Sequence, residues 1–183
     1  MLAAGTVAAV LFGLPAAGAS GAPRPATTGA SPAQLCARVS AGAVSKVVGH
    51  PVPAPSAARA KSMFDKAKNI EGLLTQCTYG PAATEAQVKK AVEIDYATLS
   101  KPVSVSIVRQ QLQSEVASDA KVKVSDYGGL SVPAVYVVAA ESGGTVEAMA
   151  AVKGTKLVIA GLGTAAPEAE VAAVTRLGVR AFM

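Results

Sequence analysis

Few side chains in this sequence are of the types that carry out chemistry. His50 is the only histidine, so it is the only candidate base for a Ser/His/Asp arrangement, which needs a base beside the nucleophile. It follows the end of an expected helix and precedes Pro51, where a histidine commonly caps the helix or lies exposed. Zinc needs more cysteine or histidine ligands than the chain offers. We therefore expect neither a catalytic histidine nor a metal site.

Glu93 and Asp95 are the one pair of carboxylates with suggestive spacing. They are two residues apart in a segment that alternates like a strand, so both point to one face. Paired carboxylates are the groups that hydrolyse glycosides. The alternate residues Val92, Ile94 and Tyr96 predict the buried face, which leaves the two acids on the solvent face. Because few aromatic residues lie nearby to stack a sugar, we interpret the pair as a polar surface.

Residues 161–164 read Gly-Leu-Gly-Thr before an expected helix, which resembles a phosphate-binding loop. The lysine of a P-loop and the third glycine of a dinucleotide fingerprint are both missing. A plain turn between a strand and a helix is the better interpretation. We expect no cofactor and no enzymatic activity, with a hydrolase of unrecognised site as the remote alternative.

Four basic residues form a cluster around a single acid, Asp65. They are Arg59, Lys61, Lys66 and Lys68. Such a cluster is a candidate anion-binding patch for envelope polymers or lipid headgroups, and the alternative is a solvated face. Nucleic acid is not expected as a partner, since no aromatic residues are interleaved with the basic ones.

The first 30 residues predict export. Residues 1–19 carry no charge, and residues 2–14 form an apolar run that is too short to span a membrane, which takes about 20 residues. Ala17-Gly18-Ala19 is a small-residue cleavage pattern, so we expect a signal peptide over 1–19 and a flexible linker over 20–30. No lysine or arginine precedes the apolar run, which departs from the usual pattern. No cysteine follows the cleavage pattern directly, so we expect a secreted or cell-wall-associated protein without a lipid anchor.

Cys36 and Cys77 are the only cysteines. In an exported protein they are expected to form a disulfide, for which two cysteines allow one intramolecular connectivity. The loop of about 40 residues would contribute roughly 3–4 kcal/mol of stability. A redox pair, which usually has C-x-x-C spacing, is the alternative.

The elements that must position these residues follow from periodicity. Ser31 and Gln34 form a capping box that begins a helix, and Gly49 ends it. A short helix is expected within residues 59–72, with Met63, Phe64 and Ala67 facing inward. Strands are then expected at 73–79, 88–99, 121–127 (an edge strand), 133–140, 146–152 and 157–162, with helices opening at 101–102 and at Pro167.

The hairpins among these strands predict an antiparallel sheet. We expect one α+β domain over residues 31–183, with a sheet of about five to six strands covered on one face by about three helices. Aromatic residues make up only 4% of the chain and the net charge is +5. The core must therefore consist of small aliphatic side chains, a bias typical of high-GC genomes.

Three short motifs stand out over roughly residues 33–182: Cys36 before Gly49, the Cys77-Thr78-Tyr79 strand start, and Gly128-Gly129-Leu130. With these motifs the layout resembles an actinobacterial family of small secreted proteins and lipoproteins of unknown function. The chain departs from the family in lacking the lipobox cysteine and in having Ser-Val-Pro after Gly-Leu. The resemblance implies an exported α+β domain, with no catalytic residues to carry over.

Together these observations predict an exported cell-envelope protein without catalytic activity, a binding module for an apolar or envelope-derived ligand. Its partner is expected to be an envelope lipid, polymer or protein, held in an apolar groove between the sheet and the helices. A structural or protein-interaction accessory, or a secreted inhibitor, is the alternative.

Overall fold

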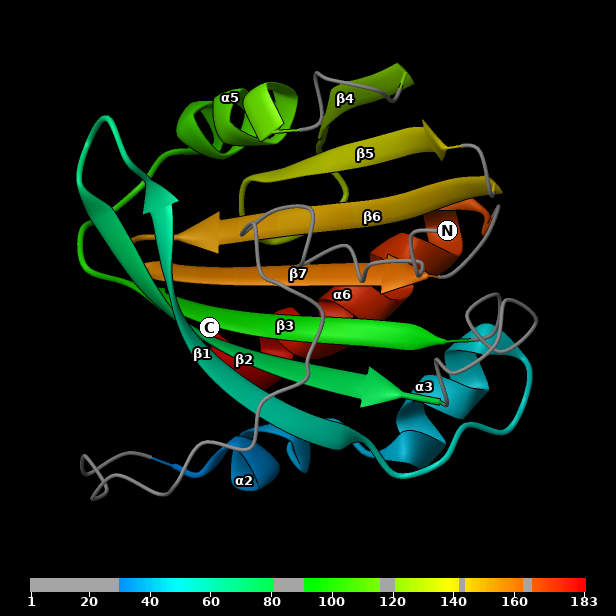
Figure 1. Ribbon diagram of the computed structural model, residues 1–183. Helices are drawn as coiled ribbons and strands as arrows, with labels where there is room; N and C mark the ends of the chain where they lie inside the picture. Colours follow the sequence, from blue (N-terminus) through cyan, green and yellow to red (C-terminus); the bar gives the residue numbers. More distant parts are fainter. Residues whose placement is uncertain (1–29, 81–90, 116–120, 142–143, 163–165) are drawn as a thin grey trace.

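A seven-stranded antiparallel sheet forms the centre of the structure (Figure 1). The computed structural model describes residues 30–80, 91–115, 121–141, 144–162 and 166–183. The expected signal peptide and nearly all of the expected linker lie outside these ranges, so both stay predictions. In the sheet the strands follow the order β1-β2-β3-β7-β6-β5-β4, and each neighbouring pair is antiparallel.

The described elements are more numerous than the sequence predicts. The strands are β1 (Ser56–Asp65), β2 (Ile70–Tyr79), β3 (Val92–Leu99), β4 (Lys121–Tyr127), β5 (Ala134–Glu141), β6 (Gly144–Lys153) and β7 (Lys156–Leu162). The helices are α2 (Pro32–Cys36), α3 (Ala41–Val48), α5 (Val105–Glu115) and α6 (Glu168–Phe182). The predicted α+β class and the antiparallel sheet are confirmed. The predicted counts of five to six strands and three helices are too low.

Helices lie on both faces of the sheet, which corrects the prediction of a single covered face. One face carries most of the helices, and we call it the helix face. On it α2 contacts β1 and β2, while α6 contacts β3, β7 and β6. The helix α5 packs on the opposite face, over β4, β5 and β6. The cause is visible in β5, where Val135, Tyr136 and Val137 are buried in succession. Such a strand is apolar on both sides and needs cover on both.

The predicted helix over residues 31–49 is divided in two. Its start and end are as expected, since Ser31 and Gln34 form the capping box and Gly49 closes α3 at a φ of 69°. The break occurs because Ser40 accepts a hydrogen bond from the N–H of Ala43 and so begins a second helix. The Tyr79 hydroxyl donates to the carbonyl oxygen of Val39 at 2.8 Å, which fixes the chain at the break.

The helix expected within residues 59–72 is wrong, because this segment forms a long hairpin of β1 and β2. Its residues alternate between the two faces, and Phe64 is buried on the α5 face while Met63 is exposed. The hairpin turns at residues 66–69, where the side chain of Asp65 accepts from the backbone N–H of Lys68 at 3.0 Å. Charged side chains at short intervals look like a polar helix face, although here they alternate along an edge strand.

The second half of the chain follows the predictions more closely. The helix α5 buries Val108 and Leu112, and α6 buries Val171 and Val174. The strand β4 lies at the edge of the sheet, and the turn between β6 and β7 contains Gly154 at a φ of 61°. None of the helices within the described residues is both long and apolar enough to cross a membrane.

Candidate functional site

One end of the helix face, which we call the bare end, carries none of the helices formed by the described residues. Phe182, the last residue of α6, packs on Tyr96 of β3 with the ring centroids 5.0 Å apart. Thr98 lies two residues further along β3 on the same face, and it is the register partner of Leu73 on β2 and of Lys156 on β7. The end of α6 therefore lies over Tyr96 and stops short of the next row of paired residues, Leu73, Thr98 and Lys156.

An open groove of about 510 Å³ lies at this bare end. Lys61 and Met63 from β1 line it, together with residues 71–73 of β2 and residues 98–100 at the end of β3. It is bounded by strands and by the residue that follows β3. Its position differs from the sequence prediction, which placed an apolar groove between the sheet and the helices.

Two large apolar side chains are exposed in this groove. Met63 is 36% exposed and Leu73 is 38% exposed, and these are the large hydrophobic side chains that the described part of the chain leaves exposed. Around them lie the ammonium of Lys61, the carboxylate of Glu71 and the hydroxyl of Thr98. A lining that combines exposed apolar and polar side chains suits a molecule with a hydrocarbon chain and a polar head.

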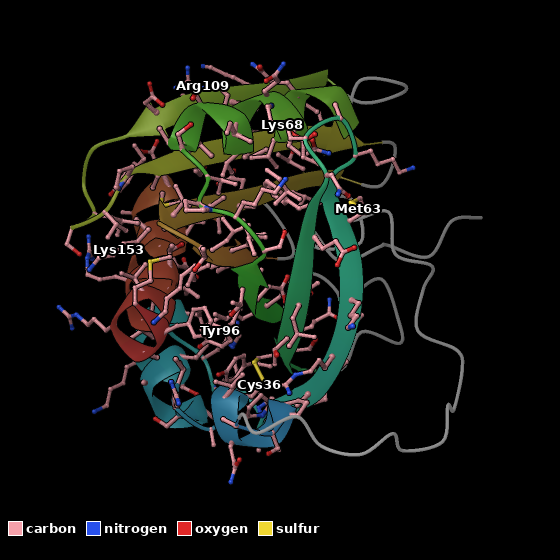
Figure 2. All side chains as sticks on the ribbon, turned by 90° about the vertical axis from the view of Figure 1, so that its left-hand side faces the viewer. Cys36, Met63, Lys68, Tyr96, Arg109 and Lys153 are labelled. Atoms are coloured by element: carbon pink, nitrogen blue, oxygen red, sulfur yellow. A yellow bond between two sulfur atoms is a disulfide. The ribbon has the colours of Figure 1, made fainter. Side chains whose placement is uncertain are left out.

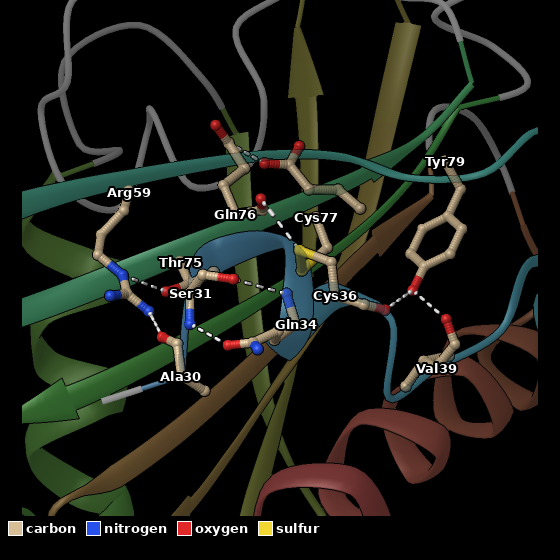
Figure 3. Close-up of a disulfide and its surroundings, with 11 residues drawn as sticks. Ala30, Ser31, Gln34, Cys36, Val39, Arg59, Thr75, Gln76, Cys77 and Tyr79 are labelled. Atoms are coloured by element: carbon tan, nitrogen blue, oxygen red, sulfur yellow. Dashed lines mark hydrogen bonds between the residues drawn. A yellow bond between two sulfur atoms is a disulfide. The ribbon is translucent and has the colours of Figure 1, made fainter. Parts of the chain in front are cut away.

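The predicted basic cluster is only partly available for binding anions. The guanidinium of Arg59 donates to the Thr75 hydroxyl at 3.2 Å and to the carbonyl oxygen of Ala30 at 2.6 Å (Figure 3). Lys68 forms an ion pair with Asp65 at 3.0 Å. Hydrogen bonds from the backbone and the ammonium of Lys68 hold the pKa of Asp65 below its usual value.

The other two members of the cluster are exposed. Lys61 lines the groove, and Lys66 lies in the turn between β1 and β2. The structure thus brings one of the four predicted residues into the groove. A single anion site built from all four stays a prediction.

The disulfide between Cys36 and Cys77 is present, with the Cα atoms 5.4 Å apart (Figure 3). It joins α2 to β2, and both cysteines are buried in the core of the helix face. The pair lies at the opposite end of β2 from Leu73, so the disulfide holds the scaffold and is not part of the groove.

Glu93 and Asp95 do not lie on a solvent face, which corrects the sequence prediction. Glu93 is 7% exposed and Asp95 is 1% exposed. The amide of Gln76 on β2 donates to a carboxylate oxygen of Glu93. Both acids are on the α5 face, whereas the groove lies on the helix face, and neither acid lines the groove.

The environment of the two acids favours their protonated forms. Burial raises the pKa of Glu93 to about 7, and the hydrogen bond from Gln76 opposes part of that effect. Burial also raises the pKa of Asp95 well above its usual value, and the neighbouring Glu93 charge adds to it. Oδ1 of Asp95 is buried without a hydrogen-bond partner. We therefore interpret the pair as a buried group that shares a proton.

Sequence reasoning missed the burial of this pair because it depends on which strands flank β3. Asp95 lies between Gln76 of β2 and Ile159 of β7 in the register. An alternating polar pattern normally indicates a solvent face. The only signal in the sequence is the unbroken apolar run of β7, which indicates a strand buried on both faces. The sequence does not say that β3 pairs with it.

Two further candidate sites from the sequence are His50 and the glycine-rich segment 161–164. The Nδ1 atom of His50 lies 3.4 Å from the carbonyl oxygen of Pro51, its neighbour in the chain. Gly161 and Leu162 end β7, and residues 163–164 lie outside the described residues. A search of those residues finds no group of three or more acidic, histidine or cysteine side chains that could hold a metal.

Comparisons with known proteins find no match, whether to protein-family models, to curated proteins or to solved structures. The family resemblance drawn from the sequence therefore stays an expectation. The case for a function rests on the chain's own geometry.

Proposed function

We propose that this is an exported, non-catalytic cell-envelope protein that binds the apolar chain of an envelope-derived amphiphile in the groove at the bare end of the sheet. The observation that carries the proposal is the placement of Met63 and Leu73. Both side chains leave more than a third of their surface exposed, and both lie in the same groove. Exposed apolar groups that converge in a concavity commonly mark a ligand or partner site.

The volume and the lining support this choice of ligand. About 510 Å³ is within the usual range for small-molecule sites. Covering Leu73 or Met63 with a hydrocarbon chain removes apolar surface from water, which is favourable by roughly 25 cal/mol per Å². Lys61 and Ser100 in the lining can hold a polar head. The Ser100 hydroxyl accepts from the backbone N–H of Glu71 at 3.0 Å and keeps its own proton to donate.

The direct test is calorimetric titration with monomeric lysophosphatidylcholine below its critical micelle concentration. This probe has a hydrocarbon chain and no net charge. We expect saturable binding that weakens roughly three- to sevenfold in Leu73→Gln. Fully burying a leucine side chain contributes roughly 1.5–3 kcal/mol, and the ligand can cover only the 38% of Leu73 that is exposed. The control is Ala58→Gln, an exposed residue of β1 outside the groove, which should bind as the parent protein does.

The same titration separates the competing functions. A folded protein that shows no binding would favour the accessory or inhibitor role, for which β1 offers the outer edge of the sheet. A hydrolase would need substrate to reach Glu93 and Asp95, and the groove does not include them. Equal binding by Leu73→Gln and the parent would place the ligand elsewhere and contradict the proposal.

A further inference from the structure

The bare end of the helix face carries a row of cationic side chains, of which only Lys61 also lines the proposed groove. Register partners point to the same side of a sheet. The row runs from Lys61 on β1 through Leu73 and Thr98 to Lys156 on β7 and Lys153 on β6. At about 4.8 Å per strand it is roughly 19 Å long, and its three lysines are exposed.

Further lysines lie beside this row at the same end of the molecule. Three connections meet there: the β1–β2 turn, the segment after β3 and the β6–β7 turn. Backbone hydrogen bonds from Leu99 to Thr155 and from Val103 to Gly154 join the end of β3 and the segment after it to the β6–β7 turn. The ammonium of Lys101 donates to the carbonyl oxygen of Lys68 at 3.1 Å, which joins that segment to the β1–β2 turn. Lys66 and Lys68 belong to the first connection and Lys101 to the second, and all three are exposed. Figure 2 looks onto this end: Lys153 lies on the side of α6, and Met63 and Lys68 lie across the end from it, on the hairpin of β1 and β2.

The acids at this end are fewer than the lysines. Asp65 is already paired with Lys68, and Glu71 is the register partner of Met63. The ammonium of Lys156 donates to the carbonyl oxygen of Phe182 at 2.8 Å, which still leaves its positive charge in the row. The end as a whole is therefore strongly cationic, with two exposed apolar side chains among the lysines.

We propose that this end of the protein docks on an anionic lipid bilayer, with the lysine row against the headgroups and with Met63 and Leu73 entering the interface. Charge complementarity selects an anionic surface, because each lysine near such a surface strengthens binding by roughly fivefold. The apolar pair selects a bilayer over a charged polymer, since a polymer of sugar or phosphate units offers no apolar region for Met63 and Leu73. In this orientation the groove opens onto the membrane.

The test is flotation of the mature protein with vesicles. The parent protein is mixed with phosphatidylcholine vesicles that contain 30 mol% phosphatidylglycerol and, separately, with pure phosphatidylcholine vesicles. We expect binding to the anionic vesicles, weaker at high salt because surface charges are screened, and little binding to the neutral ones. The variant Lys66→Gln/Lys153→Gln changes one lysine of the row and one beside it, neither of which lines the groove. It should bind about 25-fold more weakly, at roughly fivefold per lysine.

The control for charge alone is Lys46→Gln/Lys123→Gln. These lysines are also exposed but belong to α3 and β4, outside the row. Equal losses in the two double variants would overturn the proposed orientation. Met63→Gln/Leu73→Gln should also bind the anionic vesicles more weakly. If only the lysine variant loses binding, and the protein binds a soluble polyanion equally well, the bilayer proposal is wrong.

The outcome is separable from that of the groove proposal. The titration with monomeric lysophosphatidylcholine contains no bilayer and no net ligand charge. Lys66→Gln/Lys153→Gln, which leaves the groove lining intact, should still bind that probe, even though it loses the vesicles. Loss of both activities in this variant would mean that one site accounts for both observations, which contradicts a separate docking surface.

Discussion

At the scale of single residues, the buried acids of β3 are the most unusual feature of the chain. Asp95 is almost fully buried and one of its oxygens has no partner. An ionised carboxylate in such a place carries a large desolvation cost. The shared proton between Glu93 and Asp95 reduces that cost, and the Gln76 amide satisfies one oxygen of Glu93.

This arrangement predicts an unusual dependence of stability on pH. The pKa of Glu93 is about 7 in the folded protein against 4.5 ordinarily, so between these values the folded state binds protons more tightly than the unfolded state does. The stability that this group contributes is present below about pH 4.5 and is lost as the pH rises through 7. The loss is on the order of 3 kcal/mol, at about 1.4 kcal/mol per pKa unit.

Urea unfolding at pH 5 and pH 8 measures this effect. The parent protein should lose stability between the two values, and Glu93→Gln/Asp95→Asn should lose much less. The control is Glu71→Gln, which neutralises an exposed acid and should follow the parent protein. Parallel curves for the parent and the double variant would show that the pair is ionised without penalty in the folded state.

At the scale of elements, α6 packs tightly on the sheet at Gly178. A Cβ atom there would meet Cγ1 of Val158 at 2.7 Å and Cγ2 of Ile94 at 3.0 Å. These are stiff, β-branched side chains on buried strands, so they cannot move aside freely. The glycine is what lets α6 lie close to β3 and β7, and so it sets the position of Phe182 at the edge of the bare end.

Gly178→Ala should therefore destabilise the protein by about 1–3 kcal/mol, the usual cost of overpacking a core. The matched control is Gly42→Ala in α3, where a Cβ atom meets nothing within 4 Å. That substitution should stabilise the protein by up to about 1 kcal/mol, through helix propensity alone. Urea unfolding of both variants gives the comparison, and a stabilised Gly178→Ala would contradict the close packing.

The elements also show where sequence reasoning succeeds. Caps and tight turns are encoded by a few neighbouring residues, so the capping box at Ser31, the end of α3 at Gly49 and the turn at Gly154 could be predicted. The amphipathic helices α5 and α6 were equally readable from their apolar spacing. The hairpin of β1 and β2 was not, because Lys61, Met63 and their neighbours fit a polar helix as well as an alternating edge strand.

At the scale of the whole molecule, function depends on relations that no local pattern contains. The groove exists because α6 ends at Phe182 while β1, β2 and β3 continue past it, and Leu73 and Lys61 meet there only through the register of β1 with β2. The pairing of β3 with β7 likewise buries Glu93 and Asp95. The predicted basic cluster included Lys61. It could not include Lys153 and Lys156, the other lysines of the row, because they are about 90 residues later in the chain.

The central claim is that an apolar chain binds beside Met63 and Leu73 at the bare end of the sheet. The most direct measurement is NMR of the protein labelled with ¹³C at its methionine methyl groups, titrated with monomeric lysophosphatidylcholine. Met63 reports on the groove, and the fully buried Met149 on β6 is an internal control for the core. We expect the Met63 methyl resonance to shift and saturate while that of Met149 stays in place. A Met63 resonance that does not move, in a protein that stays folded, would contradict the claim.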